Sequence, residues 1–341
     1  MISSKPADRG FLDHDYVEDE RGRLYVVIGN SHPPNYVIAY LKYVPTEEVT
    51  PWRRGDKYYA RVVKRYGVRN VMPSVRPHQE FIIDSMLNAP APIVRLSNVV
   101  KHYLPELRLG ELIKHADDEL EIRVLEVIDR IRECCNVPLS NLGITGSLLP
   151  RIHNIAISDI DLVVYGCRES VEVCEYVSKC FERAPKGKLV ERLRSRAKAY
   201  GLSIDQVIKL EAPYRMLYLR NREVNICFSD KYTSRYCEFT YVPLGKALIK
   251  VKLASGDCKS LYYPSRAQVE KVIDVIKSEV NEYDVKSRLK YIISYESIYS
   301  YIMFRGGEVI TEGVVEEVLP SRDLVLIIGA QENPGYLLPS S

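Results

Sequence analysis

Several residue types are scarce in this chain, and each shortage excludes a class of protein. It has one Trp, five Met and four Gln among 341 residues, against 25 Tyr. No apolar run approaches the roughly 20 residues that a membrane-spanning helix needs. The first ten residues contain no apolar signal core. The sequence therefore predicts a cytoplasmic protein with no membrane association.

Metal-binding cysteine patterns are also missing. The eight cysteines include no Cys-x-x-Cys pair, and the six histidines do not lie beside them at zinc-ligand spacing. We therefore expect no structural zinc, and we expect reduced thiols that are mostly buried. The net charge of +3 is too small to indicate nucleic-acid binding by itself. Scarce amides and abundant Arg, Val and Ile resemble the composition of a heat-adapted organism.

The remaining composition predicts a soluble globular protein. Hydrophobic residues make up 46% of the chain and charged residues 27%, and the length suits two or three domains. We expect a β-rich N-terminal module with a connector at 1–115, a central α/β domain at 116–235 and an α+β domain at 236–341. In the last of these, an apparent capping box at 265–268 predicts a helix that runs to Val280.

The strongest local pattern lies at residues 143–166. Gly146 and Ser147 follow a short apolar strand and precede a predicted helical turn, so their backbone N–H groups can point at an anion. Further on, Asp159 and Asp161 flank Ile160 at the start of a buried strand. Side chains at i and i+2 share one face of a strand, so the two carboxylates should converge. Such a pair repels unless a cation lies between its members, and oxygen ligands with phosphates suit Mg²⁺.

This segment resembles the signature of the DNA polymerase beta-like nucleotidyltransferase superfamily. The resemblance lies in Gly146-Ser147, eleven intervening residues that end in Ser158, and then Asp159-Ile160-Asp161. Weaker similarity extends to an archaeal family of predicted nucleotidyltransferases. The supporting stretches are 30–34, 38–45, 164–166 and 312–316. The resemblance implies a central mixed sheet with helices, which binds a nucleoside triphosphate and one or two Mg²⁺ ions at Asp159 and Asp161.

Members of this superfamily often take a third acid from a later strand, where it is cast as the general base. The candidates here are Glu223, Asn225 and Asp230, on or after the second strand of a predicted hairpin around residues 221–222. Glu223 and Asn225 share a face. We expect Glu223 to be the catalytic residue, whereas an alignment of Asn225 with the third acid would mean that the site has lost a charge.

The most basic part of the sequence follows the acidic strand. Its cations are Arg183, Lys186, Lys188, Arg192, Arg194, Arg196 and Lys198. They can bind a triphosphate or an RNA backbone through salt-sensitive contacts. Alternatively, they form the solvated face of a helix that buries Leu189, Leu193 and Ala197.

The sequence thus predicts a magnesium-dependent nucleotidyltransferase whose acceptor hydroxyl belongs to RNA or to another macromolecule. Gly146 and Ser147 would hold the phosphates, with Asp159, Asp161 and Glu223 as the catalytic residues. The alternative is a catalytically degenerate protein that keeps the fold and binds nucleotide or RNA.

Overall fold

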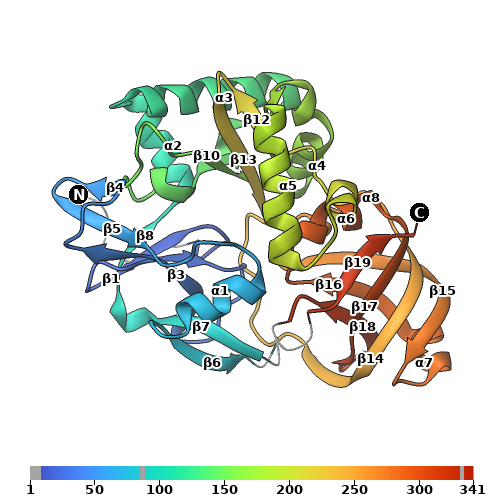
Figure 1. Ribbon diagram of the computed structural model, residues 1–341. Coiled ribbons are helices and arrows are strands. Elements are labelled where there is room, and N and C mark those ends of the chain that lie inside the picture. Colours follow the sequence, from blue (N-terminus) through green and yellow to red (C-terminus); the bar gives the residue numbers. More distant parts are fainter. Residues whose placement is uncertain (1–8, 85, 87–88, 331–333, 341) are drawn as a thin grey trace.

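The computed structural model describes residues 9–84, 86, 89–330 and 334–340 and shows a mixed α/β protein built around three sheets. In Figure 1 the central sheet and its helices lie at the top, the N-terminal sheet at the lower left and the C-terminal sheet at the lower right. Helix α5 runs down from the upper part towards the junction of the other two. The three sheets therefore lie around helix α5.

The N-terminal sheet has eight strands, with the main order β4-β5-β3-β2-β1-β8 and with β7 joining β6 to β3. Strands β1 and β2 pair antiparallel and form a hairpin of this β-rich part. The elements are β1 Tyr16–Asp19, β2 Leu24–Val27, β3 Tyr36–Thr46, β4 Trp52–Arg54, β5 Lys57–Arg61, α1 Val68–Val75, β6 Glu80–Asp84, β7 Ala89–Arg95 and β8 Val99–Tyr103.

The central sheet has the order β11-β12-β13-β10-β9, in which β10 is parallel to β13 and antiparallel to β9. Helix α2 packs against β9 so closely that a Cβ on Gly143 would lie 2.6 Å from Pro105. The elements are α2 Pro105–Lys114, α3 Glu119–Cys135, β9 Leu142–Ile144, β10 Ile160–Tyr165, α4 Cys167–Tyr176, β11 Glu182–Arg183, α5 Lys186–Tyr200, α6 Ile204–Lys209, β12 Leu217–Leu219 and β13 Arg222–Ser229.

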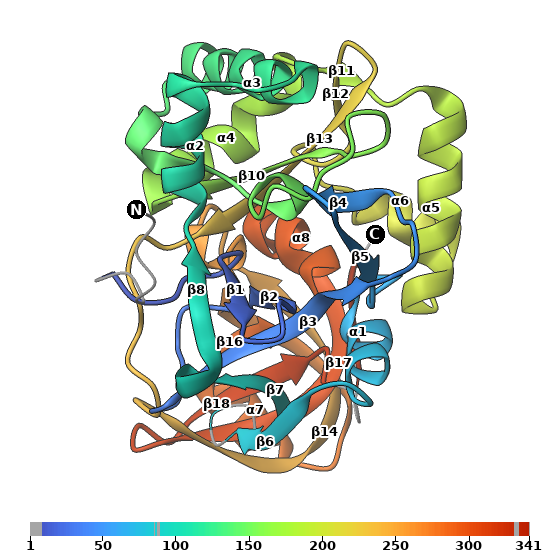
Figure 2. The same cartoon turned by 90° about the vertical axis from the view of Figure 1, so that its left-hand side faces the viewer.

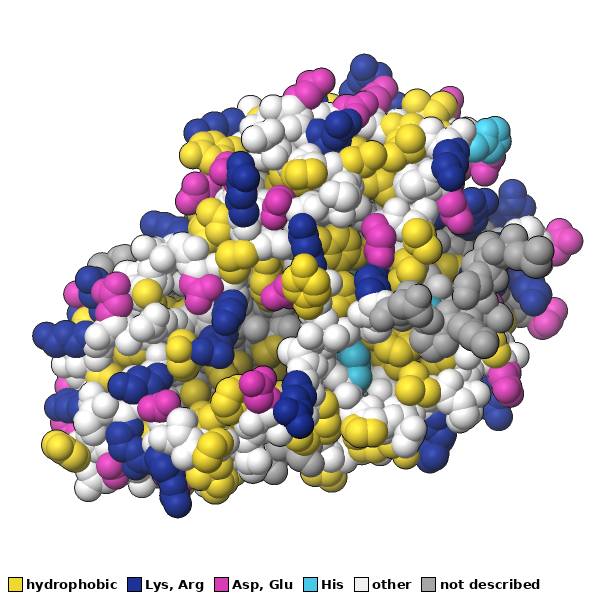
Figure 3. All heavy atoms as spheres, turned by 180° about the vertical axis from the view of Figure 1, so that it is seen from behind, with side chains coloured by type: hydrophobic (Ala, Val, Ile, Leu, Met, Phe, Trp, Pro, Cys, Tyr) yellow, Lys and Arg dark blue, Asp and Glu magenta, His cyan; other side chains and the backbone are white. Residues whose placement is uncertain are grey.

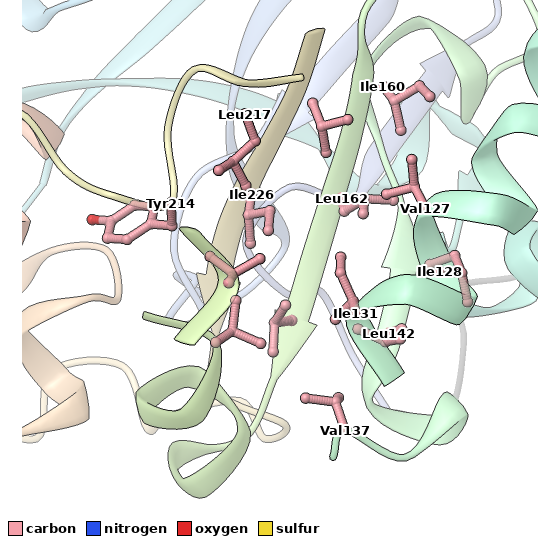
Figure 4. Packing of buried hydrophobic residues seen from close by; sticks show 14 of the residues in the cluster. Val127, Ile128, Ile131, Val137, Leu142, Ile160, Leu162, Tyr214, Leu217 and Ile226 are labelled. Carbon is pink, nitrogen blue, oxygen red and sulfur yellow. The ribbon is translucent and has the colours of Figure 1, made fainter. Parts of the chain in front are cut away.

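Helix α3 covers one face of this sheet. Its apolar residues at helical spacing, among them Val127 and Ile131, point at Leu162 of β10 (Figure 4). The helix begins at Glu119, and Asp118 is its N-cap. The side chain of Asp118 accepts hydrogen bonds from the N–H groups of Leu120 and Glu121. Ile160, Leu162 and Val164 are fully buried on this side, so the intervening residues of β10 must face away from the helix.

The C-terminal sheet closes on itself, because β14 pairs with both β15 and β17. The predicted helix from Ser265 to Val280 is wrong: Ser265–Ser278 forms strand β15. Three register shifts between β14 and β15 interrupt the two-residue alternation, and this gives the apolar residues a helix-like spacing. The elements are β14 Thr240–Leu253, β15 Ser265–Ser278, α7 Glu282–Arg288, β16 Leu289–Ser294, α8 Ser300–Arg305, β17 Gly307–Leu319, β18 Asp323–Ile328 and β19 Tyr336–Pro339.

The expectation of reduced cysteines is contradicted for four of the eight. Cys134 is bonded to Cys180, and Cys167 at the start of α4 is bonded to Cys258 of the C-terminal part. The partners are 46 and 91 residues apart in the sequence, so spacing alone gave no sign of either pair. Cys135 and Cys174 are free and buried, as expected for small apolar residues.

Two global features agree with the composition. Among the described residues, no helix is both long and apolar enough to cross a membrane. On the face shown in Figure 3, basic and acidic side chains are interspersed. This matches the small net charge, so any charge selectivity must come from local clusters.

Glu296 links the C-terminal part to the N-terminal module. Its side chain lies before the first turn of α1, where Oε1 accepts a hydrogen bond of 2.9 Å from the N–H of Val68. Burial raises the pKa of Glu296 from 4.5 to about 7, although the Val68 N–H and Arg69 act in the opposite direction. The carboxyl group of Glu296 therefore binds its proton more tightly in the folded chain than in the unfolded chain.

Stability should depend on pH through Glu296. Its contribution is fully present below pH 4.5 and is lost as the pH rises towards 7, the raised pKa. The loss is on the order of 3 kcal/mol in the free energy of unfolding. Glu296→Gln should therefore flatten the fall in stability across this window, which urea unfolding at several pH values would measure. Equal slopes in wild type and variant would refute the assignment.

Candidate functional site

The Gly146-Ser147 turn is built against the acidic strand. It follows β9 as a single turn over Gly146–Leu148, and the N–H of Thr145 donates a 2.9 Å hydrogen bond to the carbonyl oxygen of Asp161. Gly146 has a φ of +66°, and a Cβ at this position would lie 2.1 Å from Oδ2 of Asp161. Only glycine allows the backbone to approach the carboxylate this closely.

Ser147 is held within the loop that leads to the acids. Its hydroxyl donates to Oγ of Ser158 at 3.2 Å, and Ser158 Oγ accepts from the N–H of Asn154 at 2.9 Å. Ser147 and Ser158 are both buried. The structure thus brings Ser147 to the acidic strand, where its side chain fixes the position of the residue that precedes Asp159.

Asp159 and Asp161 lie at the start of β10 on the face opposite the α3 core. Solvent reaches Asp159, and Asp161 is half-buried. Loss of hydration and then the charge of Asp161 raise the pKa of Asp159 to about 6, although Arg192, Arg222 and Lys188 act in the opposite direction. A carboxylate whose ionisation is opposed by a neighbouring carboxylate is an arrangement that a divalent cation relieves.

Neither carboxylate is neutralised by a salt bridge. Among the residues that the structure describes, no Lys or Arg nitrogen lies within 4.0 Å of the carboxylate oxygens of Asp159 or Asp161. Asp161 Oδ1 accepts one hydrogen bond of 3.3 Å from Nδ2 of Asn225. The pair therefore keeps most of its oxygen lone pairs free for a cation.

The register of β10 with β13 sorts the three candidates for the third acid. Asn225 lies directly beside Asp161, and Glu223 lies on the same face two residues earlier, which places it level with Asp159. Asp230 follows the last residue of β13, at the opposite end of the strand pair, so it lies apart from the site. The structure brings Glu223 and Asn225 to the aspartates and leaves Asp230 out.

Glu223 already has partners. Its carboxylate forms an ion pair with Arg192 of α5 and accepts a 3.1 Å hydrogen bond from the hydroxyl of Tyr218. Arg192 also donates to Oδ1 of Asn225 at 3.3 Å. Burial, and then the charges of Arg196 and Arg215, lower the pKa of Arg192 to about 10. Arg192 therefore spans the two candidates for the third acid.

The basic run divides into parts with different surroundings. Lys188 and Arg192 act electrostatically on Asp159, and Arg196 pairs with Glu211 at 2.6 Å. Lys186 and Arg194 line an open hollow elsewhere on α5. The helix that the sequence allowed is present, but of its three predicted apolar residues only Leu193 is buried. The predicted basic run thus contains the cations that act on Asp159, but only the fold shows which members of the run these are.

Arg222 is a site residue that the sequence did not reveal. Its guanidinium donates to the carbonyl oxygens of Ile155, Ala156 and Ser158, at 2.7 to 3.2 Å. It therefore holds the loop before Asp159 and places a positive charge near that carboxylate. In the sequence it is only the residue after a hairpin turn, with no motif around it.

Two other groups of side chains come close enough together to hold a metal ion. In one, Asp118 caps α3 and bonds Nε2 of His153 at 2.8 Å, while Glu121 pairs with buried Arg108. In the other, Cys135 lies beside the bonded pair Cys134 and Cys180. In the first group the carboxylates are thus already engaged by His153 and Arg108, and two sulfurs of the second are bonded to each other.

Comparison with known proteins gives one distant relative. Uncharacterized protein MJ1086 of Methanocaldococcus jannaschii is 24% identical over 328 residues, which cover 89% of this chain and 90% of that protein. No family model matches the chain. No solved structure matches it either.

Proposed function

We propose that this chain is a metal-dependent nucleotidyltransferase whose central part has a polymerase beta-like fold. It would transfer a nucleoside monophosphate from a nucleoside triphosphate to an acceptor hydroxyl. The observation that carries the proposal is the contact of the Gly146 backbone with the Asp161 carboxylate. It sets the Gly146-Ser147 turn beside a carboxylate pair, so a phosphate chain and its cation could be held together there.

The donor set fits Mg²⁺, which prefers a few carboxylate oxygens together with substrate phosphates. Asp159 and Asp161 would hold one or two such ions, which when bound would neutralise charge that develops on the phosphates. The amide of Asn225 supports this set, because its Nδ2 donates to Asp161 and so fixes the orientation of that carboxylate. Substrate phosphates would complete the coordination.

The surrounding cations suit a polyanionic donor. Lys188 and Arg192 approach from α5, and Arg222 approaches from the start of β13. Arg192 can give up its ion pair with Glu223 and bind a phosphate oxygen instead, since a guanidinium binds carboxylate and phosphate groups well. That exchange would release Glu223 beside the reacting groups.

In the proposed reaction, the acceptor oxygen forms a bond to the α-phosphorus while the bond to pyrophosphate breaks. Glu223, the remaining carboxylate on this face, would receive the proton of the attacking hydroxyl. Lys188 and Arg192 would balance the charge on the departing pyrophosphate. RNA is the acceptor that we favour, because Lys186 and Arg194 place further positive charge at the surface of the same helix.

A catalytically degenerate binding protein is the second candidate. Asn225 favours it, because an amide occupies the position beside Asp161 where a third carboxylate would lie. The ion pair of Glu223 with Arg192 favours it as well. Such a protein would bind nucleotide or RNA without turnover.

The test is transfer of label from α-labelled nucleoside triphosphates, each incubated with Mg²⁺ and with cellular RNA or protein as acceptor. We expect wild type to label a macromolecule and Asp159→Asn to lose that activity. Equal labelling by the two proteins would refute the enzymatic proposal. Metal-independent RNA binding without transfer would support the degenerate protein.

A further inference from the structure

The N-terminal sheet carries a buried cation that the proposed site does not yet use. Lys42 on β3 is only 7% exposed. Its Nζ lies 5.5, 5.8 and 5.7 Å from the ring centroids of Tyr16, Tyr43 and Tyr66. No salt bridge joins Lys42 to a carboxylate within the part of the chain that the structure describes. Burying a charge that has no oppositely charged partner costs free energy, which contacts with aromatic rings offset only in part.

The walls of this tyrosine cage are neutral. Burial raises the pKa of Tyr16 and of Tyr43, so both keep their protons at neutral pH. Burial disfavours the charged form of Lys42, and the rings of the neutral tyrosines surround its ammonium group. The cage therefore holds an ammonium group that no carboxylate of the described residues pairs with.

One polar group in the cage lacks a well-directed partner. The hydroxyl of Tyr16 is fully buried and makes no hydrogen bond of good geometry, although Lys42 lies beside it. Buried hydroxyls are nearly always satisfied. Arg61 adds a second cation, with its guanidinium 5.4 Å from the Tyr66 ring centroid and Nη2 donating to the Tyr66 hydroxyl at 2.9 Å. Together these groups offer donors and positive charge to an anion.

The cage lies against the loop of the proposed site. Tyr16 and Tyr43 share an apolar cluster with Leu149 and Ile152, which follow the Gly146-Ser147 turn. Burial is the main cause of the raised pKa of Tyr43, and the charge of Asp161 makes a small contribution in the same direction. In Figure 2, strands β1 to β3 lie beneath the loops at the start of β10.

Two hydrogen bonds join the N-terminal module to this loop beside the cage. The N–H of Arg53 donates to the carbonyl oxygen of Ile152 at 3.3 Å, and Asn154 Nδ2 donates to the carbonyl oxygen of Pro51 at 3.2 Å. The Tyr66 side of the cage borders solvent, because this residue is 49% exposed.

We propose that Lys42 and its tyrosine cage bind the polyphosphate of the nucleotide donor, on the side of the site that the N-terminal sheet forms. This inference rests on the proposed function for the identity of the ligand. The N-terminal module would then be a part of the donor site. Phosphate oxygens would pair with the ammonium group and with the hydroxyl of Tyr16, which satisfies both groups.

The test measures the binding of inorganic tripolyphosphate by calorimetry, with and without Mg²⁺. Lys42→Met keeps the length of the side chain and removes its charge, and we expect it to weaken binding at least tenfold without lowering the melting temperature. The matched control is Lys101→Met. Lys101 also lies over a tyrosine of this sheet, 4.2 Å from the Tyr103 ring centroid, but near Glu18. We expect unchanged binding there.

Tripolyphosphate binding that is equal in wild type and Lys42→Met would overturn the inference, as would an equal loss in Lys101→Met or an absence of binding to wild type. Transfer of label by wild type, with the same KM for the donor in Lys42→Met, would overturn it while the proposed function stands. Lys42-dependent tripolyphosphate binding without any transfer would support the inference and overturn the proposed function.

Discussion

Replacing Asp161 with Asn is expected to reduce nucleotidyl transfer by about three orders of magnitude. Asp161 is the carboxylate that touches the Gly146 backbone, and it lies beside Asn225. An amide in its place would leave Asp159 as the only carboxylate of the proposed metal site. Metal ions stabilise transition-state charge by several kcal/mol, and about 4 kcal/mol corresponds to a thousandfold in rate. The initial rate of label transfer at saturating Mg²⁺ measures the effect.

Asp230→Asn is the matched control for this change. It removes the same charge after the same pair of strands, but at the end away from the aspartates. We expect a rate close to that of wild type. Magnesium titration adds a second readout, because Asp161→Asn should need more Mg²⁺ for the activity that remains. A similar loss of rate in both variants would show that overall charge matters and not the proposed metal site.

The acid pair could be predicted from sequence because it depends on local periodicity alone. Alternation over Asp159, Ile160 and Asp161 already puts both carboxylates on one face. The choice among Glu223, Asn225 and Asp230 could not be made in this way. It depends on the register of two strands about 64 residues apart, which pairs Asp161 with Asn225. Register is set by packing of the whole sheet, and the sequence around β13 does not reveal it.

In the C-terminal part, too, local sequence predicted some elements correctly and one wrongly. Strand β18 at Asp323–Ile328 and strand β16 at Leu289–Ser294 coincide with short apolar runs, as strands usually do. Strand β15 was predicted as a helix, because its irregular pairing with β14 brings apolar residues to helical spacing. Closure of the sheet through the β14 and β17 pair stabilises a long strand there. Tertiary pairing overrides a local pattern in such a case.

The N-terminal side of the site was also hidden from sequence reasoning. Lys42 and Tyr43 lie about 120 residues from Asp161, and only the folded chain brings Tyr43 close to it. Arg54 forms an ion pair with Glu18 of the same sheet at 2.7 Å, so a cation beside aromatic residues in this module can be purely structural. Burial separates the two cases, because Lys42 is enclosed without a carboxylate. Burial of that kind cannot be read from composition.

Replacing Gly146 with Ala is expected to lower transfer by about a hundredfold or more, with a smaller loss of stability. The added methyl group would lie 2.1 Å from Oδ2 and 2.9 Å from Cγ of Asp161, so the carboxylate must move away. The φ of +66° adds backbone strain of roughly 1 kcal/mol for a residue with a side chain. A displacement of about 1 Å at a reacting centre can cost a factor of about a hundred in rate.

Gly187→Ala supplies the matched comparison. No atom lies within 4 Å of a Cβ at Gly187, which is in the first turn of α5. Alanine should therefore leave the rate unchanged and stabilise the helix by up to about 1 kcal/mol. Thermal unfolding and label transfer, measured on both variants, separate folding from function. If Gly146→Ala loses stability but keeps its rate, the turn is a structural support and does not position Asp161. If its rate falls while most of its stability remains, the close contact between glycine and carboxylate is what holds the proposed metal ligand in place.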